Sequence, residues 1–107
     1  MPFDALDIAH QVIRELRPLV AAIAASDPDL ARQIRKAATS VPLNVSEGRQ
    51  RAGKDRKHLW RIAAGSAAET VEALHVAVSW GYVDDAAAVA ALASLDRVRA
   101  MLWRLTH

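Results

Sequence analysis

The chain has 107 residues and a mass of 11.6 kDa, which is the size of one domain, so we expect a single domain over residues 1–107. Hydrophobic residues make up 52% of the sequence, aromatic residues only 5%, and 23 residues are alanine, a composition that favours helices over a β-sandwich or disorder. The formal net charge of +2 is a weak sign of polyanion binding, although the isoelectric point near 9.5 leaves it open. Cysteine is absent, which excludes disulfides, thiol nucleophiles and Cys-ligated zinc.

The start of the chain carries an acid, Asp4, where a secretory signal would carry basic residues. The longest apolar runs fall far short of the roughly 20 residues that span a bilayer. We therefore expect a soluble, cytoplasmic protein with no membrane segment.

A first helix is predicted over residues 4–25, because apolar residues recur there every three or four positions. Pro18 lies inside this segment and removes one backbone donor, so we expect a kink near residues 14–17 rather than an end. The side chains expected to face the core are Leu6, Ala9, Val12, Ile13, Leu16, Leu19, Val20 and Ile23.

A second helix is predicted to begin at Asp27 or Pro28, since a capping side chain followed by proline is typical of a helix start. Pro42 is expected to bend it, and Gly48 and Gly53 bracket its end, with a linker over residues 49–53. Its expected apolar face consists of Leu30, Ile34, Ala37, Val41 and Val45.

A third helix is predicted over residues 54–80, with Gly81 as a left-handed cap. The small residues 63–68 let another helix approach closely, which would offset the cost of about 1 kcal/mol of Gly65 relative to alanine. The expected inner face consists of Leu59, Ile62, Ala63, Ser66, Thr70, Ala73, Leu74 and Ala77.

A fourth helix is predicted to start at Asp84 or Asp85 and to end near Leu105, with Val89, Leu92, Leu95, Val98, Leu102 and Leu105 facing inward. Four helices of about 20 residues with short connections predict an all-α, antiparallel up-down-up-down four-helix bundle. The alanine-rich faces indicate either burial by other copies of the chain, in a homo-oligomer, or alanines at exposed helix positions.

Charge is distributed unevenly along the sequence. Residues 1–31 carry a net charge of −3, residues 32–61 of +7, residues 62–96 of −5 and residues 97–107 of +3. Folded as an antiparallel bundle, the chain collects nine cations toward one end: Arg49, Arg51, Lys54, Arg56, Lys57, Arg61, Arg97, Arg99 and Arg104. The opposite end receives Asp27, Asp29, Asp84 and Asp85.

This basic end, which also holds the start of the third helix, is suited to bind anions. The residues predicted to contact nucleic-acid phosphates are Arg49, Arg51, Lys54, Arg56, Lys57 and Arg61. The alternative is a solvated surface that keeps the protein soluble and sets the orientation of subunits. Trp60 lies near two of these cations and is a candidate for stacking on an unpaired base, but packing at a helix or subunit interface is the commoner role, also for Trp80 and Trp103.

Catalytic and metal motifs are weak in this sequence. Glu72 and His75 have the spacing of a di-iron helix motif, but such a site needs a second motif and two further glutamates. No Gly-rich phosphate loop and no Ser-His-Asp arrangement can be assigned. We therefore expect no catalytic residues, no metal and no cofactor, and hence no enzyme.

Polar residues near the inner faces of the second and third helices predict a structural hydrogen-bond network. A buried Asn44 or Glu47 must be hydrogen-bonded, and Ser40, Ser66, Glu69 and Thr70 are possible partners. The network is assigned to Asn44, Glu47, Ser66 and Glu69, with a role in fixing the register of the bundle. The alternative is a ligand or catalytic site.

Three stretches of the sequence carry a family resemblance: residues 33–48 (QIRKAATSVPLNVSEG), 64–70 (AGSAAET) and 81–82 (GY). The Asn-x-x-Glu-Gly and Gly-Ser-x-x-Glu patterns within them resemble the four-helix-bundle proteins encoded by intervening sequences of bacterial 23S ribosomal RNA genes. Val41, Leu43 and Val45 stand where isoleucine is usual in that family. The resemblance extends over nearly the whole chain.

The resemblance implies an antiparallel bundle that assembles as a ring-shaped homo-oligomer, usually a pentamer, without an established enzymatic activity. A related bundle is the accessory protein of diversity-generating retroelements, which binds nucleic acid and a reverse transcriptase through a basic surface. Expected partners are therefore other copies of the chain, RNA or DNA, and a protein such as a reverse transcriptase. The predicted function is non-enzymatic nucleic-acid binding; the alternative is a structural adaptor that docks a protein partner.

Overall fold

Four helices make up the chain in the computed structural model, which describes the backbone of residues 2–107 and the side chains of residues 4–107. They are α1 (Pro2–Ser26), α2 (Pro28–Arg49), α3 (Gly53–Trp80) and α4 (Asp85–Thr106). The described residues contain no strand, so the prediction of an all-α four-helix fold is confirmed. None of these helices is long and apolar enough to cross a membrane.

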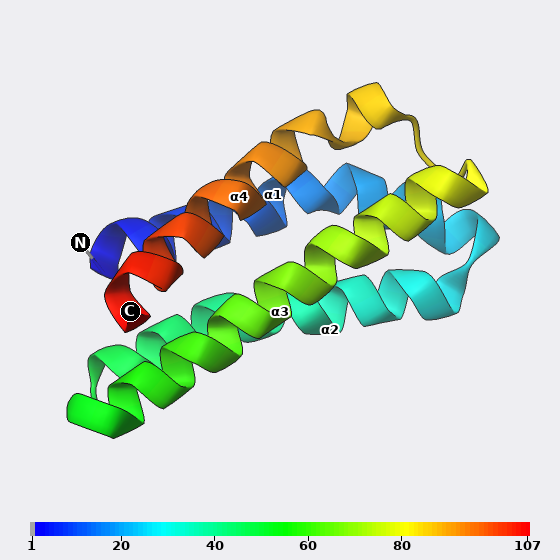
Figure 1. Ribbon diagram of the computed structural model, residues 1–107. Coiled ribbons are helices and arrows are strands. Elements are labelled where there is room, and N and C mark those ends of the chain that lie inside the picture. The colour runs from blue at the N-terminus through cyan, green and yellow to red at the C-terminus, as the bar shows by residue number, and fades with distance from the viewer. Residues whose placement is uncertain (1) are drawn as a thin grey trace.

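Each helix packs against two others: α1 and α3 both contact α2 and α4. The α1–α2 and α3–α4 connections lie at one end of the molecule, and the α2–α3 connection and both termini lie toward the other (Figure 1). Hydrogen bonds between different segments of the chain lie at both ends of the molecule. The Tyr82 hydroxyl donates to Asp27 Oδ2 at 3.2 Å, and the Arg61 guanidinium donates to the Thr106 carbonyl oxygen at 3.0 Å.

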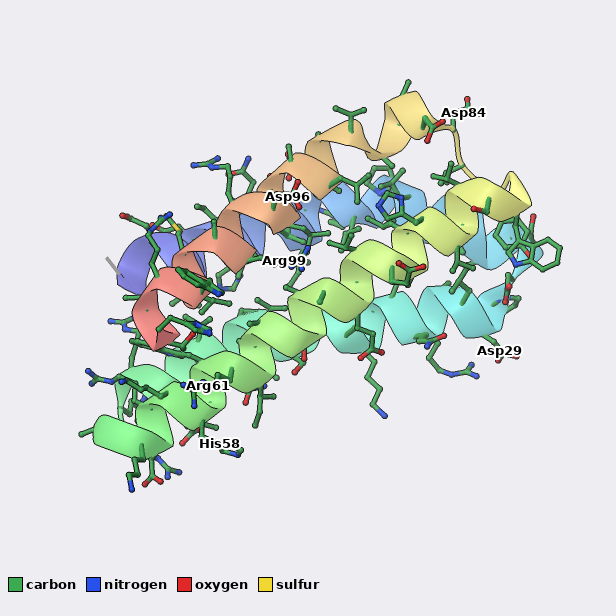
Figure 2. The ribbon with its side chains drawn as sticks, viewed as in Figure 1. Asp29, His58, Arg61, Asp84, Asp96 and Arg99 are labelled. Atoms are coloured by element: carbon green, nitrogen blue, oxygen red, sulfur yellow. The ribbon has the colours of Figure 1, made fainter. Side chains whose placement is uncertain are left out.

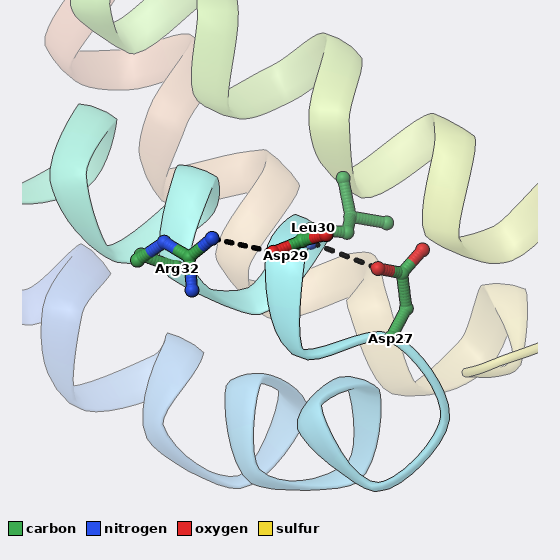
Figure 3. A network of polar contacts seen from close by, with 4 residues as sticks. All are labelled: Asp27, Asp29, Leu30 and Arg32. Atoms are coloured by element: carbon green, nitrogen blue, oxygen red, sulfur yellow. Dashed lines mark hydrogen bonds and ion pairs between the residues drawn. The ribbon is translucent and has the colours of Figure 1, made fainter.

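The helix ends follow the signals in the sequence closely. The Asp27 side chain caps α2 by accepting from the Leu30 amide at 3.0 Å, and Asp29 pairs with Arg32 in the first turn (Figure 3). Gly81 ends α3 with a φ of 81°, a left-handed conformation that glycine adopts without strain. Both α1 and α2 continue through their internal prolines, Pro18 and Pro42, as the unbroken apolar period predicts.

The core lies between the four helices and is made of aliphatic side chains. Its largest fully buried members include Ile23, Ile34, Leu74, Leu95 and Leu102, one or two from each helix. The predicted apolar face of α2 is confirmed, since all five of its residues are buried. In α1 the predicted face is correct in the main, and Ala5 and Ile8 join it near the N-terminus.

Two predicted core residues face outward instead: Ile62 is 40% exposed and Val89 is 61% exposed. The reason is that alanines occupy the tightest positions of α3 and α4, so Ala63 and Ala88 take the inward positions next to them with no exposed surface. The prediction of a close contact at Gly65 is also wrong within the chain, because a Cβ added there would have no neighbouring atom within 4 Å.

Candidate nucleic-acid interface

The α2–α3 connection projects beyond the rest of the bundle (Figure 1). The hydrogen bond from Arg61 places the end of α4 beside the third turn of α3, so the first two turns of α3 extend roughly 10 Å past it. We call residues 47–61 the basic hairpin. It holds all six residues predicted to contact phosphates, Arg49, Arg51, Lys54, Arg56, Lys57 and Arg61, against two acids, Glu47 and Asp55.

Trp60 holds the two helices of the basic hairpin together. Its side chain is only 4% exposed, and its indole N–H donates to the Val45 carbonyl oxygen at 3.1 Å. The ring lies against Gly48, where an added Cβ would be 2.4 Å from Trp60 Nε1. Trp60 therefore packs at a helix interface, as the commoner role predicts, and its burial excludes stacking on a base.

Two of the predicted phosphate contacts already bind backbone carbonyls. Arg56 donates to the Gly48 and Arg49 carbonyl oxygens, at 3.1 Å each, and its guanidinium carbon lies 5.5 Å from the Trp60 ring centroid. The last carbonyls of a helix lack intrahelical partners and carry partial negative charge, so a guanidinium is a suitable partner. Arg56 satisfies the end of α2 in this way, and Arg61 does the same for Thr106 at the end of α4.

The remaining cations of the basic hairpin differ in solvent exposure and in their contacts with neighbouring residues. Arg51 forms an ion pair with Glu47, at 3.0 Å, in which both side chains are about half exposed. Arg49 is partly buried. Lys54 and Lys57 are exposed, and neither makes a hydrogen bond or ion pair with any described residue. The two lysines are thus the cations whose charge the folded chain does not neutralise locally.

The two ends of the bundle carry opposite charge. Asp29 and Asp84 lie at the end opposite His58 and Arg61 (Figure 2), and Asp27 and Asp85 flank the same two connections. Of the three α4 cations predicted to lie toward the basic end, Arg104 is in the last turn, and Arg97 and Arg99 lie further back in the C-terminal half of the helix, with Arg99 4.0 Å from Asp96.

The predicted polar network is smaller than expected and is centred on Ser40. The Asn44 side-chain amide donates to the carbonyl oxygen and the hydroxyl of Ser40, at 2.9 Å each. Ser66 donates to the same hydroxyl at 2.9 Å, which links α2 to α3, and Thr70 donates to the Ser66 carbonyl at 2.8 Å.

The two predicted glutamates lie outside this network. Glu47 is exposed and pairs with Arg51 in the α2–α3 connection, and Glu69 is exposed on α3. No buried side-chain nitrogen or oxygen among the described residues lacks a hydrogen-bond partner. The Ser40 cluster is therefore satisfied internally and joins two helices, which is the arrangement of a structural contact.

Glu72 and His75 are both exposed on α3, and the described residues contain no group of three or more side chains able to hold a metal. The contact between Gly48 and Trp60 was not predicted, since the sequence places Gly48 only at the end of a helix. The signal available for it was a glycine in the last turn of one helix followed by a tryptophan in the first turns of the next. Ser40 was predicted as a possible partner in the polar network, and the structure places it at the centre.

Fold and charge together define a four-helix bundle with a basic and an acidic end. Residues 4–104 match the family model of the 23S rRNA-intervening sequence protein, and the chain belongs to this family. A crystal structure of a protein with unknown function from the S23 ribosomal protein family of Bacteroides thetaiotaomicron superposes with a TM-score of 0.85 at 18% identity, over 95% of this chain and 97% of that one. It shares the fold. No curated protein matches the chain.

Proposed function

We propose that this protein binds RNA or DNA through the basic hairpin, contacting phosphates without reading base sequence and without catalysing a reaction. The observation that carries the proposal is the pair Lys54 and Lys57, exposed and unpaired on a hairpin that projects from the bundle. Because they are not neutralised by neighbours, they are available to displace counterions from a phosphate backbone.

The start of α3 supports the same proposal. Its N-cap residue, Ala52, makes no side-chain capping bond, so the first amide groups of the helix are open to an outside acceptor. Free amides and the positive end of the helix dipole both favour a phosphate there. Lys54 and Lys57 lie within this first stretch of α3 and add full charges to the partial ones.

The test is fluorescence anisotropy with duplex DNA and structured RNA at several salt concentrations. If four or five phosphates are neutralised, log K should fall with log salt with a slope of roughly −3 to −5. Lys54→Glu with Lys57→Glu should weaken binding at least tenfold and flatten the slope. Arg35→Glu with Lys36→Glu makes the same charge change on an exposed part of α2 outside the hairpin and is the matched control. Equal losses in the two variants, or none in the first, would refute the hairpin as the interface.

We further propose that the antiparallel bundle works in the cytoplasm as a ring-shaped homo-oligomer, with a pentamer as the expected form. Large apolar side chains left exposed on the single chain support this: Leu43 at 64%, Val89 at 61% and Trp80 at 69%. In a homo-oligomer these side chains would be buried against neighbouring copies of the chain. Parallel packing of the chains in a ring would place their basic hairpins on one face.

A second candidate function is a structural adaptor that docks a protein, for example a reverse transcriptase. It is favoured by the stacked pair Trp80 and Tyr82, which presents exposed aromatic surface near the acidic end, away from the hairpin. Recovery of a protein partner after nuclease treatment, by a purified protein that has no nucleic-acid affinity, would support the adaptor over nucleic-acid binding.

A further inference from the structure

A groove of about 410 Å³ runs between α3 and α4 next to the basic hairpin. Its lining combines two cations, Arg61 and Arg99, with the aromatic ring of Trp103, while Ala64 and Ala100 supply small side chains that leave room between the helices. None of the six hairpin residues other than Arg61 contributes to it. The groove is thus a separate feature that shares one arginine with the hairpin.

Trp103 is held in place on one side and open on the other. It is 60% exposed, and its ring stacks on the imidazole of His107 with the centroids 4.5 Å apart and the planes 12° from parallel. His107 is itself fixed, since its Nδ1 lies 3.0 Å from the Trp103 carbonyl oxygen and 3.2 Å from the Thr106 hydroxyl. An exposed, oriented indole is a platform on which another flat ring can stack with little loss of side-chain entropy.

The arginines of the groove retain donors for an anion. One nitrogen of Arg61 donates to Thr106, which fixes the guanidinium at the groove and leaves its other N–H groups unused. Arg99 lies 4.0 Å from Asp96, the outer limit of an ion pair, and both side chains are well exposed. Such a loose surface pair contributes little stability, so Arg99 can turn to a stronger anionic partner.

We propose that this groove binds one unpaired nucleotide, whose base stacks on Trp103 and whose phosphate is held by Arg61 and Arg99. A flat ring with an anionic group beside it is the ligand chemistry that an exposed indole flanked by guanidiniums fits. The proposal rests on the proposed function and extends it: the basic hairpin contacts phosphates of any strand, and the groove adds a preference for a single-stranded segment.

A contact between copies of this chain is the competing explanation for an exposed tryptophan. Arg61, Arg99 and Asp96 line the groove, so burial of Trp103 against an apolar partner would also desolvate these charges. The surroundings of Trp103 therefore favour a polar, anionic ligand.

The experiment compares a labelled single strand of about 12 nucleotides with the duplex of the same sequence, by anisotropy at one salt concentration. Trp103→Ala should weaken binding of the single strand about tenfold and change duplex binding less than twofold. Trp103→Phe keeps an aromatic platform and should retain most of the affinity. Ile62→Ala is the control, because Ile62 is another exposed apolar side chain, on α3, and does not line the groove.

Arg99→Gln provides an independent test that leaves the indole intact, and it too should weaken the single strand more than the duplex. Unchanged single-strand binding by Trp103→Ala and Arg99→Gln overturns the inference while leaving the proposed function intact, provided that the wild type still binds the duplex. A lower oligomer mass of Trp103→Ala in light scattering assigns the residue to a subunit contact and also overturns it. If the wild type binds neither strand form, both the inference and the proposed function fail.

Discussion

At the scale of single residues, the contact between Gly48 and Trp60 decides whether the basic hairpin can exist. The indole occupies the space that a side chain at position 48 would need, and its N–H reaches the Val45 carbonyl only because α2 and α3 approach so closely there. The absence of a Cβ at Gly48 thus allows Trp60 to be buried between α2 and α3. This packing in turn positions the helix connection and its cations.

Gly48→Ala is expected to destabilise the fold by about 1–3 kcal/mol, because the new Cβ overpacks a buried, hydrogen-bonded ring. Gly65→Ala is the control: it lies in the same kind of helical backbone with open space around it, so the higher helix propensity of alanine should stabilise the protein by up to about 1 kcal/mol. Urea unfolding of both variants measures the difference. Equal effects in the two variants would contradict the packing argument.

The comparison of these two glycines shows what the sequence could and could not predict about packing. The run of small residues around Gly65 suggested a close helix approach, and the structure has that approach at Gly48 instead. Composition marks where a helix lacks bulk, but not which neighbour comes near. That depends on the rotation of α3 about its axis, which also moved Ile62 from the predicted core to the surface.

Tyr82 gives a second test at this scale. Partial burial, then its hydrogen bond to Asp27 and the charge of that carboxylate, raise the pKa of Tyr82 above its ordinary value of 10.0. Since the folded protein holds this proton more tightly than the unfolded chain, stability should be unaffected below about pH 10 and should fall as pH rises toward the raised pKa.

The chain has one tyrosine, so tyrosinate absorbance during an alkaline titration reports Tyr82 alone. Midpoints are compared for the folded protein and for the protein in denaturant, and a lower midpoint in the folded state would be inconsistent with the contact to Asp27. In Tyr82→Phe, which has no phenol to titrate, the fall in stability above about pH 10 that is due to Tyr82 should be absent.

At the scale of elements, the ends of α2 and α4 are both completed by arginines from α3. This arrangement explains why cations that look equivalent in the sequence differ in role. Arg56 and Lys57 are adjacent, yet one binds the carbonyls that end α2 and the other points to solvent without a partner. Which cation meets a carbonyl depends on the angle at which the connection turns, and no local pattern encodes that angle.

Arg56→Ala should lower stability by about 1–3 kcal/mol, because two carbonyl oxygens lose a charged donor and Trp60 loses its guanidinium cover. Lys57→Ala should change stability by less than about 0.5 kcal/mol, as expected at an exposed position. Lys57→Ala should lower the affinity for nucleic acid without changing stability. Thermal unfolding and anisotropy on the same samples separate the two roles; loss of affinity without loss of stability in Arg56→Ala would place Arg56 among the phosphate contacts instead.

The helices themselves were the most predictable part of the molecule. Pro28 and Gly81 mark the start of α2 and the end of α3 because proline and glycine act through backbone geometry that needs no tertiary partner. The apolar face of α2 was predictable because large aliphatic residues alternate with charged ones. Val89 was misplaced because alanines on every side of α4 leave several rotations of the helix almost equally apolar.

At the scale of the whole molecule, a net charge of +2 conceals the separation of a basic hairpin from an acidic end about one bundle length away. The longest dimension is 43 Å, several times the Debye length of about 8 Å at physiological salt, so the two ends act on a ligand independently. A polyanion at the hairpin is therefore attracted by the local cations and is hardly repelled by the distant carboxylates. The net charge alone could not predict this, whereas the charges of successive segments could.

Assembly into a ring predicts that affinity for a duplex increases with the length of the duplex. If parallel chains form a ring, their hairpins share one face, and a long duplex contacts several of them at once. A duplex of about 40 base pairs should then bind at least tenfold more tightly per molecule than one of about 10 base pairs, which spans roughly 34 Å and meets few hairpins. Light scattering should give about five times the chain mass of 11.6 kDa for a pentamer. The same affinity for both lengths, from a protein with the mass of one chain, would show that the hairpin acts alone.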